Sequence, residues 1–278
     1  MLSIFIMYST DRYAALQHTL ACLRVMPGYE ESQKTLVVDG KIDRIPEEWE
    51  AVQVPRIENK FCWGRMWDAG VCTAKHEKII YLDSDRLLPK NYLQKVEKIV
   101  EDDVFVFTSK HFNMLSDTPV VTCQKFLNGW IEINDREIAG KIRYEPRFQE
   151  PYHGPSKNVM SGSTAFTKKT YFRLGGVDHW YCGHGAYADS DFHMQASVGG
   201  CYFADLEIPE LHYPHAKLSE DRSELDQHTL YRLGLDNFIY YCKKWNLPMA
   251  LAENLAVRCG LKKPTRYIDK KVRALPNA

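Results

Sequence analysis

The sequence lacks an excess of charge of either sign, since 36 Lys and Arg residues balance 36 Asp and Glu residues. A neutral chain exerts no strong overall field on nucleic acid or on anionic lipid. The one local excess is the basic tail, 258–273, where seven basic side chains meet a single acidic residue, Asp269. We expect this tail to contact an anionic membrane or nucleic acid, or to be a solvated helix face.

The sequence also lacks the signals of export and of membrane insertion. No stretch approaches the roughly 18 apolar residues of a membrane-spanning helix, and the N-terminus has no basic start or small-residue cleavage site. The eight cysteines include no C-x-x-C pair, which disfavours a zinc site of ordinary spacing and a disulfide framework. We therefore expect a cytoplasmic protein with reduced thiols, peripheral at a membrane if the basic tail binds one.

No internal repeat, low-complexity segment or linker interrupts the chain, and strand-sized apolar runs alternate with helix-like segments over 1–110. This alternation predicts an α/β fold with a mainly parallel sheet and helices on both faces. Ligands of such sheets bind at the carboxyl ends of the strands. The strand-like runs are 2–9, 34–40, 51–56, 78–85 and 103–109, and the helix-like segments are 11–26, 64–74 and 91–102.

The second half of the chain is less regular. Residues 128–146 are expected to contain an antiparallel hairpin, and 158–203 read as a turn, a strand, a helix, a Gly-rich loop and a further helix. The last sixty residues look helical. We expect a domain over 1–217, with a nucleotide-binding half (1–110) and an acceptor half (111–217), and a helical C-terminal extension over 218–278.

Acidic side chains follow the predicted strands. Asp11 follows the first strand, Asp39 the second, and Asp83 and Asp85 flank Ser84 after a later one. Two carboxylates at i and i+2 can reach one side of a small cavity. Mg²⁺ and Mn²⁺ prefer oxygen ligands, and a diphosphate would supply the remaining ones. A plain turn is the alternative, because turns favour Asp and Ser.

Other charged residues allow two interpretations each. Asp39 could accept the N3–H of a uracil ring or belong to a turn before glycine. Asp11, followed by Arg12, could also cap the first helix. Arg65 could contact a phosphate or lie on a helix surface.

A second acidic patch lies in "GHGAYADSDF", 183–192. Gly183 permits close approach of the backbone to a ligand. Asp189 and Asp191 open a helix, whose dipole stabilises carboxylates. One of them could be a general base for an acceptor hydroxyl, or both could cap the helix. His212 and His215 follow at i and i+3, and one of them could be a further metal ligand.

The order of these motifs resembles the GT-A-type glycosyltransferases, especially the family-two enzymes and the galactosyl- and N-acetylgalactosaminyltransferases. "IFIMYSTDRYAALQHTL" is similar to the opening strand, turn and helix of that family, and "LVVDG" to its base-binding turn. "WGRMWDAGVCTAKHEKIIYLDSDRLLPKNYL" resembles its Arg-x-x-Gly helix, strand and D-x-D motif. "SGSTAFTKKTYFRLGGVDHWYCGHGAYADSDF" resembles its acceptor segment, and "LHYPHAKLSE" its later metal-binding histidine. The resemblance covers about 2–220 and implies a GT-A (Rossmann-like) fold.

The resemblance also implies roles for single residues. Asp189 would be the base, with Asp191 at the supporting position, although Ala188 replaces the usual Glu and leaves that division open. Metal ligands would be Asp85, Asp83 and one histidine, His212 in preference to His215. Trp180 would stack on a sugar ring or be a core residue. The donor would contact Ser9, Asp11, Arg12, Asp39, Arg65, Asp83, Ser84, Asp85, Trp180 and Gly183.

The expected activity is an inverting transfer of a sugar from a nucleotide sugar, UDP-linked by preference, with Mn²⁺ or Mg²⁺ as cofactor. The acceptor would be a hydroxyl of a glycan or glycolipid. An alternative is a phage-type DNA glycosyltransferase acting on hydroxymethylated bases, in which the basic tail contacts phosphates. A non-catalytic sugar-binding protein on the same fold is a third possibility.

Overall fold

The computed structural model describes residues 1–9, 12–42, 44–56, 61–115, 118–144, 162–182, 187–214, 227–258 and 260–275, with the backbone alone over 227–233. Within these residues, seven strands form a central sheet in the order β10-β6-β9-β4-β1-β2-β3. All are parallel except β9, which is antiparallel to both neighbours. The strands are β1 (Leu2–Ser9), β2 (Gln33–Asp39), β3 (Glu50–Val54), β4 (Lys78–Asp83), β6 (Val104–Phe107), β9 (Ser163–Thr167) and β10 (Tyr202–Asp205).

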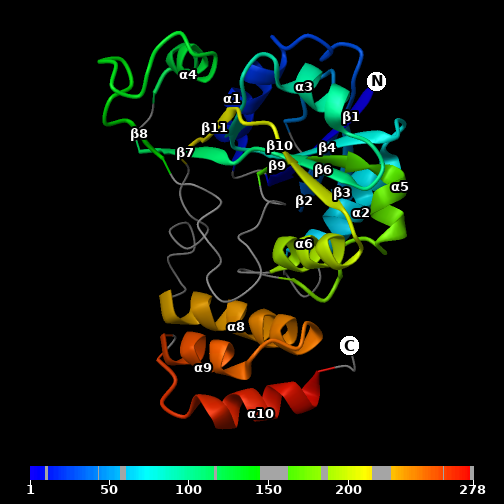
Figure 1. Cartoon of the computed structure of the whole chain (residues 1–278), viewed down its shortest axis with the longest axis vertical. Helices are drawn as coiled ribbons and strands as arrows, with labels where there is room; N and C mark the ends of the chain where they lie inside the picture. Colours follow the sequence, from blue (N-terminus) through cyan, green and yellow to red (C-terminus); the bar gives the residue numbers. More distant parts are fainter. Residues whose placement is uncertain are drawn as a thin grey trace.

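Helices cover both faces of this sheet, as the sequence predicts (Figure 1). Alternate residues of β1 point to opposite faces. Ile4 and Ile6 therefore join a core cluster with α1 (Tyr13–Leu23) and α3 (Tyr92–Ile99), whereas Phe5 joins one with α2 (Trp63–Thr73), α5 (Lys168–Arg173) and α6 (Ala188–Val198). Burial on both faces explains why the N-terminal run carries apolar residues on both faces rather than alternating.

A second, smaller sheet has the order β5-β11-β7-β8. Its strand β11 pairs in parallel with β7 and antiparallel with β5, so that His212 lies opposite both Asn113 and Arg86. This register brings together residues far apart in the sequence. The strands are β5 (Arg86–Leu87), β7 (Lys110–Met114), β8 (Ile142–Tyr144) and β11 (Pro209–His212).

The predicted hairpin over 128–146 is wrong in the part that the structure describes, 128–144. There β8 pairs with β7, not with a strand of its own segment. The chain before β8 closes in turns that follow α4 (Val120–Leu127). The carbonyl of Asp135 accepts the backbone N–H groups of Ile138 and Ala139, and Ile138 is fully buried. Local turns therefore satisfy the backbone groups that a hairpin would have paired.

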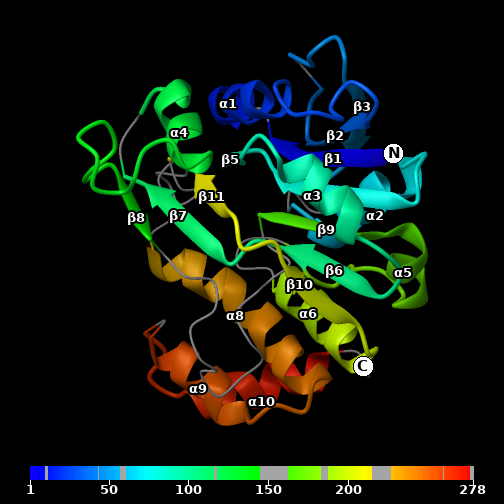
Figure 2. The ribbon, with the colours of Figure 1, turned by 45° about the horizontal axis from the view of Figure 1, so that its top comes forward.

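Three helices lie beyond the sheet at the C-terminal side: α8 (Gln227–Lys244), α9 (Met249–Arg258) and α10 (Pro264–Ala274). They share a core of their own, with Leu235 and Ile239 of α8 against Ala252 and Ile268 of the other two helices. Figure 2 shows α8 as the member of this group nearest to α6. The expected domain boundary at 217 lies outside the described residues. None of the described helices has the length and hydropathy needed to cross a bilayer.

Candidate functional site

The carboxyl ends of β1, β2 and β4 meet at one edge of the central sheet. In the parallel pairing, Ser9 is level with Asp39, and Met7 with Asp83. The polar residues that follow these strands in the sequence are therefore neighbours in space. Of the predicted donor contacts, Asp11 and Gly183 lie outside the described residues, as does the histidine His215.

Asp39 ends β2 and is 5% exposed. Arg56 binds its carboxylate with two nitrogens: Nε donates to Oδ1 at 2.9 Å and Nη2 to Oδ2 at 2.6 Å. Sequence reasoning missed Arg56, although β3 places Val54, two residues earlier, beside Asp39. The arginine holds the carboxylate in one orientation at the sheet edge. Arg65, in the first turn of α2, donates to the carbonyl of Pro55 at 3.4 Å.

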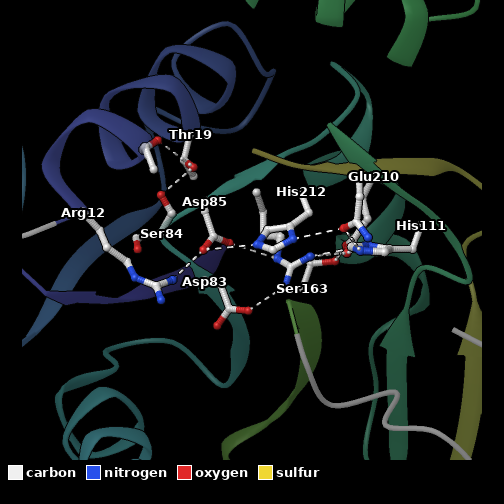
Figure 3. A network of polar contacts seen from close by, with 12 residues as sticks. Arg12, Thr19, Asp83, Ser84, Asp85, His111, Ser163, Glu210 and His212 are labelled. Carbon is white, nitrogen blue, oxygen red and sulfur yellow. Dashed lines mark hydrogen bonds and ion pairs between the residues drawn. The ribbon is translucent and has the colours of Figure 1, made fainter. Parts of the chain in front are cut away.

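Asp85 is the most enclosed carboxylate of the D-x-D motif, with 2% exposure. Arg12, at the start of α1, donates from Nη1 to its Oδ2 at 2.8 Å. Nε of Arg86 lies 3.3 Å from Oδ1, and Nε2 of His212 lies 3.5 Å from Oδ2. Figure 3 shows Arg12 and His212 approaching this carboxylate from two sides.

Asp83 and Ser84 support the same turn. The carboxylate of Asp83 accepts a hydrogen bond from the hydroxyl of Tyr81 and another from Nη2 of Arg86, at 3.0 Å. The carbonyl of Ser84 accepts from the hydroxyl of Thr19 in α1 at 3.0 Å. These contacts tie the D-x-D turn to the strand before it and to the first helix, so that Asp85 is held in a defined position.

Sequence reasoning also missed the buried polar network beside this turn. Glu210 is fully buried and its carboxylate contacts His111 Nδ1 at 2.9 Å, Thr108 Oγ1 at 2.7 Å and the hydroxyl of Ser163. Nη1 of Arg86 lies 3.4 Å from the same carboxylate. The network runs from Arg12 through His212 to Glu210 (Figure 3). One feature of the sequence could have indicated this network: a basic residue, Arg86, directly follows D-x-D.

Arg86 is the central cation of the network. Burial acts to lower its pKa, but the carboxylates of Asp85, Asp83 and Glu210 outweigh this effect and raise the pKa from its ordinary value. The guanidinium therefore stays charged and balances part of the negative charge.

His212 has the surroundings of a histidine that can bind a metal. Its Nδ1 lies 3.1 Å from Oδ1 of Asn113, and its Nε2 faces Asp85. Asn113 in turn lies 3.2 Å from Nε2 of His111. His212 is partly exposed, so that a ligand can reach this nitrogen.

The donor set fits a cation shared with a substrate better than a closed metal site. Among the described residues, no three His, Cys, Asp or Glu side chains cluster in a way that could hold a metal ion. Asp85 and His212 offer one oxygen and one nitrogen 3.5 Å apart. Two ligands about 2.1 Å from one metal lie roughly 3 Å apart, so a small shift would suffice. Mg²⁺ commonly takes one or two protein ligands and completes its shell with phosphates and water.

The two carboxylates that open α6 differ in their surroundings. Asp191 is fully buried, and Trp245 and Lys244 of the C-terminal region donate to it at 2.7 and 2.8 Å. Asp189 is only partly buried, and its Oδ1 accepts the N–H of Ser190 at 2.8 Å. Burial, Asp83 and also Asp189 raise the pKa of Tyr81, so both carboxylates lie within electrostatic range of that phenol. The helix α6 itself packs on the sheet face that carries Tyr81, because Ala188 and Phe192 belong to the same core cluster.

Trp180 precedes the acidic helix and is 41% exposed. Its ring stacks on that of Tyr240 in α8, with centroids 5.1 Å apart. It is therefore a partly exposed aromatic surface, not a core residue.

No protein-family model matches the chain, and no curated protein sequence does either. Solved structures of glycosyltransferases match its fold at 11–12% identity. S. aureus TarS 1-349 with UDP-GlcNAc matches with a TM-score of 0.53 over 91% of this chain and 70% of that chain. GalNAc-T7 with UDP, GalNAc and Mn²⁺ matches with 0.55 over 99% and 56%. The mannosyltransferase PcManGT from Pyrobaculum calidifontis with GDP-Man and Mn²⁺ matches with 0.51 over 98% and 73%. The chain therefore has the predicted GT-A fold.

Proposed function

We propose that this chain is a glycosyltransferase that moves a sugar from a nucleotide sugar to an acceptor hydroxyl with the help of a divalent cation. One observation carries the proposal: Asp85 and His212 converge at the carboxyl edge of a GT-A sheet. The structural neighbours were solved with UDP-GlcNAc, with UDP and Mn²⁺, and with GDP-Man and Mn²⁺. A UDP-sugar is our preferred donor.

In this proposal the edge of the sheet binds the donor. Asp39, oriented by Arg56, accepts the N3–H of the base. Ser9, Arg12 and Arg65 line the path of the ribose and the diphosphate. Asp85 and His212 hold the cation, which neutralises the charge that develops on the diphosphate leaving group. Asp83, Ser84 and, outside the described residues, Asp11, Gly183 and His215 keep their predicted donor or metal roles as part of the proposal.

Asp189 acts as the general base and takes the proton of the acceptor hydroxyl as that oxygen attacks the anomeric carbon. Asp191 keeps a supporting role, because its buried carboxylate already accepts from Trp245 and Lys244. A base on the acceptor side, opposite the leaving diphosphate, leads to inversion in one displacement. Trp180 offers a partly exposed ring for stacking on a sugar.

For the acceptor we propose a glycan or glycolipid hydroxyl. The basic tail is helical over α10, where Arg266, Lys270 and Arg273 are exposed and Ile268 is buried. Its contact with a membrane or with hydroxymethylated DNA stays a prediction, and no observation favours the DNA alternative. We also propose that 1–217 is the transferase domain and 218–278 an extension.

The test is release of nucleotide from a panel of nucleotide sugars with Mn²⁺, repeated with candidate acceptors. We expect Asp189→Asn to lower transfer at least about 100-fold while UDP still binds. Asp85→Asn should lower Mn²⁺-dependent turnover about as much, with a weaker apparent affinity for the metal. Asp102→Asn, which removes an exposed partner of Lys169, is the matched control and should have no effect. Transfer by Asp189→Asn close to that of the wild type would disprove the assignment of the base. UDP-sugar binding without any nucleotide release would favour the non-catalytic alternative.

A further inference from the structure

One partly buried cation in the C-terminal region joins two carboxylates that lie on either side of Asp189 in the sequence. Nζ of Lys244, in the last turn of α8, donates to Oδ2 of Asp178 and to Oδ2 of Asp191, both at 2.8 Å. The lysine side chain is 18% exposed, and that of Asp191 is fully buried. Asp178 lies before α6 and Asp191 lies in its first turn, so Lys244 connects these two parts of the chain.

Neighbouring side chains reinforce the same contact. Oδ1 of Asp191 accepts from Nε1 of Trp245 at 2.7 Å and from the hydroxyl of Tyr181 at 3.1 Å. The hydroxyl of Tyr240 donates to Oδ2 of Asp178 at 3.0 Å. Each of the two carboxylates therefore accepts from Lys244 and from at least one aromatic side chain.

The chain on both sides of 183–186 also rests on α8. Before this stretch, Nδ2 of Asn237 donates to the carbonyl of Cys182 at 3.0 Å. After it, the ring of Tyr187 stacks on Phe238 and on Tyr241, with centroids 4.8 and 5.9 Å apart. The helix α8 therefore contacts the chain both at Cys182 and at Tyr187.

Helix geometry relates the contacts of Asp191 to the orientation of Asp189, the proposed base. Residues at i and i+2 of an α-helix point about 200° apart, since each residue turns the helix by about 100°. Asp191 points to Lys244 and Trp245, so Asp189, in the same turn, leaves α6 in a different direction. Ala188 and Phe192 of α6 share a core cluster with Tyr81, whose hydroxyl donates to Asp83, so α6 packs on the sheet face that leads to the D-x-D turn. Holding Asp191 therefore sets the rotation of α6 that directs Asp189 to the reacting centre.

The buried carboxylate needs this lysine. Burial raises the pKa of Asp191, and the hydrogen bond and charge of Lys244 oppose that rise. For Lys244, burial lowers the pKa, whereas Asp178 and Asp191 raise it and prevail. A buried charge that loses its partner is strongly unfavourable, so the start of α6 would move or open to hydrate Asp191 if the lysine were removed.

We propose that Lys244 is a positioning residue for the transfer reaction: it holds Asp178 and Asp191 together and thereby aims Asp189 at the acceptor hydroxyl. This role rests on the proposed function, since it takes Asp189 as the base. In this proposal the C-terminal helices help to position the proposed base, a role that no single motif of the sequence indicates.

The test compares Lys244→Met with Lys271→Met, a control that breaks a half-exposed ion pair between α10 and Asp236 of the same helix α8. We expect Lys244→Met to lower kcat at least about tenfold, because small misplacements of a reacting group are costly, and to leave the Kd of UDP within about twofold. Trp245→Phe keeps the ring and removes one donor to Asp191, so it should lower kcat about threefold in a folded protein. Lys271→Met should change neither quantity.

Amide hydrogen exchange measures how firmly α6 is held in place, and it does not require enzymatic turnover. In Lys244→Met and Trp245→Phe, amides of 187–198 should exchange faster than in the wild type, while those of β4 should not. Unchanged exchange in α6 would overturn the positioning role, as would a loss of kcat matched by an equal loss of UDP affinity, or an equal effect of Lys271→Met. Absence of nucleotide release by the wild type would instead refute the proposed function, and the exchange result would still decide whether Lys244 holds α6.

Discussion

Replacing Arg86 by Met tests how much the charge of one arginine stabilises the fold by balancing the carboxylates around it. Its guanidinium nitrogens lie 3.0 Å from Asp83, 3.3 Å from Asp85 and 3.4 Å from Glu210, and the residue is 7% exposed. Methionine fills a similar volume but carries no charge, so three carboxylates lose this partner at once. Removing one member of a buried ion pair costs about 3–5 kcal/mol, and we expect a loss in this range or above it.

The assay is thermal unfolding in EDTA at pH 7.5. For a chain of this size, about 1 kcal/mol corresponds to roughly 2–4 °C, so the Tm should fall by about 6–20 °C. Arg173→Met is the control, because its pair with Asp103 is exposed and should contribute about 1 kcal/mol or less. We also expect Mn²⁺ with UDP to raise the Tm of Arg86→Met more than that of the wild type, since the cation replaces the missing positive charge. A Tm within 3 °C of the wild type would refute this account of the cluster.

Two further predictions concern the nucleotide and the dependence on pH. Asp39→Asn should weaken binding of UDP about tenfold in a calorimetric titration with kcat little changed, because a charged acceptor for the base is lost; an unchanged Kd would contradict the role of Asp39. Burial lowers the pKa of His193 to about 4 from an ordinary 6.5. Between pH 6.5 and 4 the unfolded chain therefore binds a proton at this histidine that the folded chain does not bind, so the free energy of unfolding decreases as the pH is lowered. Denaturant unfolding should show His193→Gln losing about 2 kcal/mol less than the wild type between pH 7.5 and 5, and parallel losses would contradict this.

The outline of the fold could be predicted because its signals are local. Each strand of the parallel core is a short, mainly apolar run that ends in a polar turn, and the run from 2 to 9 carries apolar residues on both faces because helices cover both of them. The same pattern places Asp39 and Asp83 at strand ends, and the parallel register then brings those ends together. The hairpin failed for the opposite reason, since β8 finds its partner in a distant strand.

The polar network could not be predicted, because long-range pairing assembles it. Arg86, His111 and Glu210 come from three strands of the small sheet, and nothing near Glu210 in the sequence indicates that it is fully buried. The difference between Asp189 and Asp191 has the same origin. Both open the same helix, and only the packing of α8 buries one of them. Their catalytic roles, and that of His212, stay predictions until variants are measured.

The most direct test of the central claim is nucleotide release by the purified protein from a panel of UDP- and GDP-sugars, with Mn²⁺ and with EDTA. The account predicts that at least one donor is turned over with Mn²⁺, that EDTA abolishes turnover, and that Asp85→Asn lacks it while Asp102→Asn does not. No release from any donor, together with no saturable binding of UDP in the presence of Mn²⁺, would contradict it.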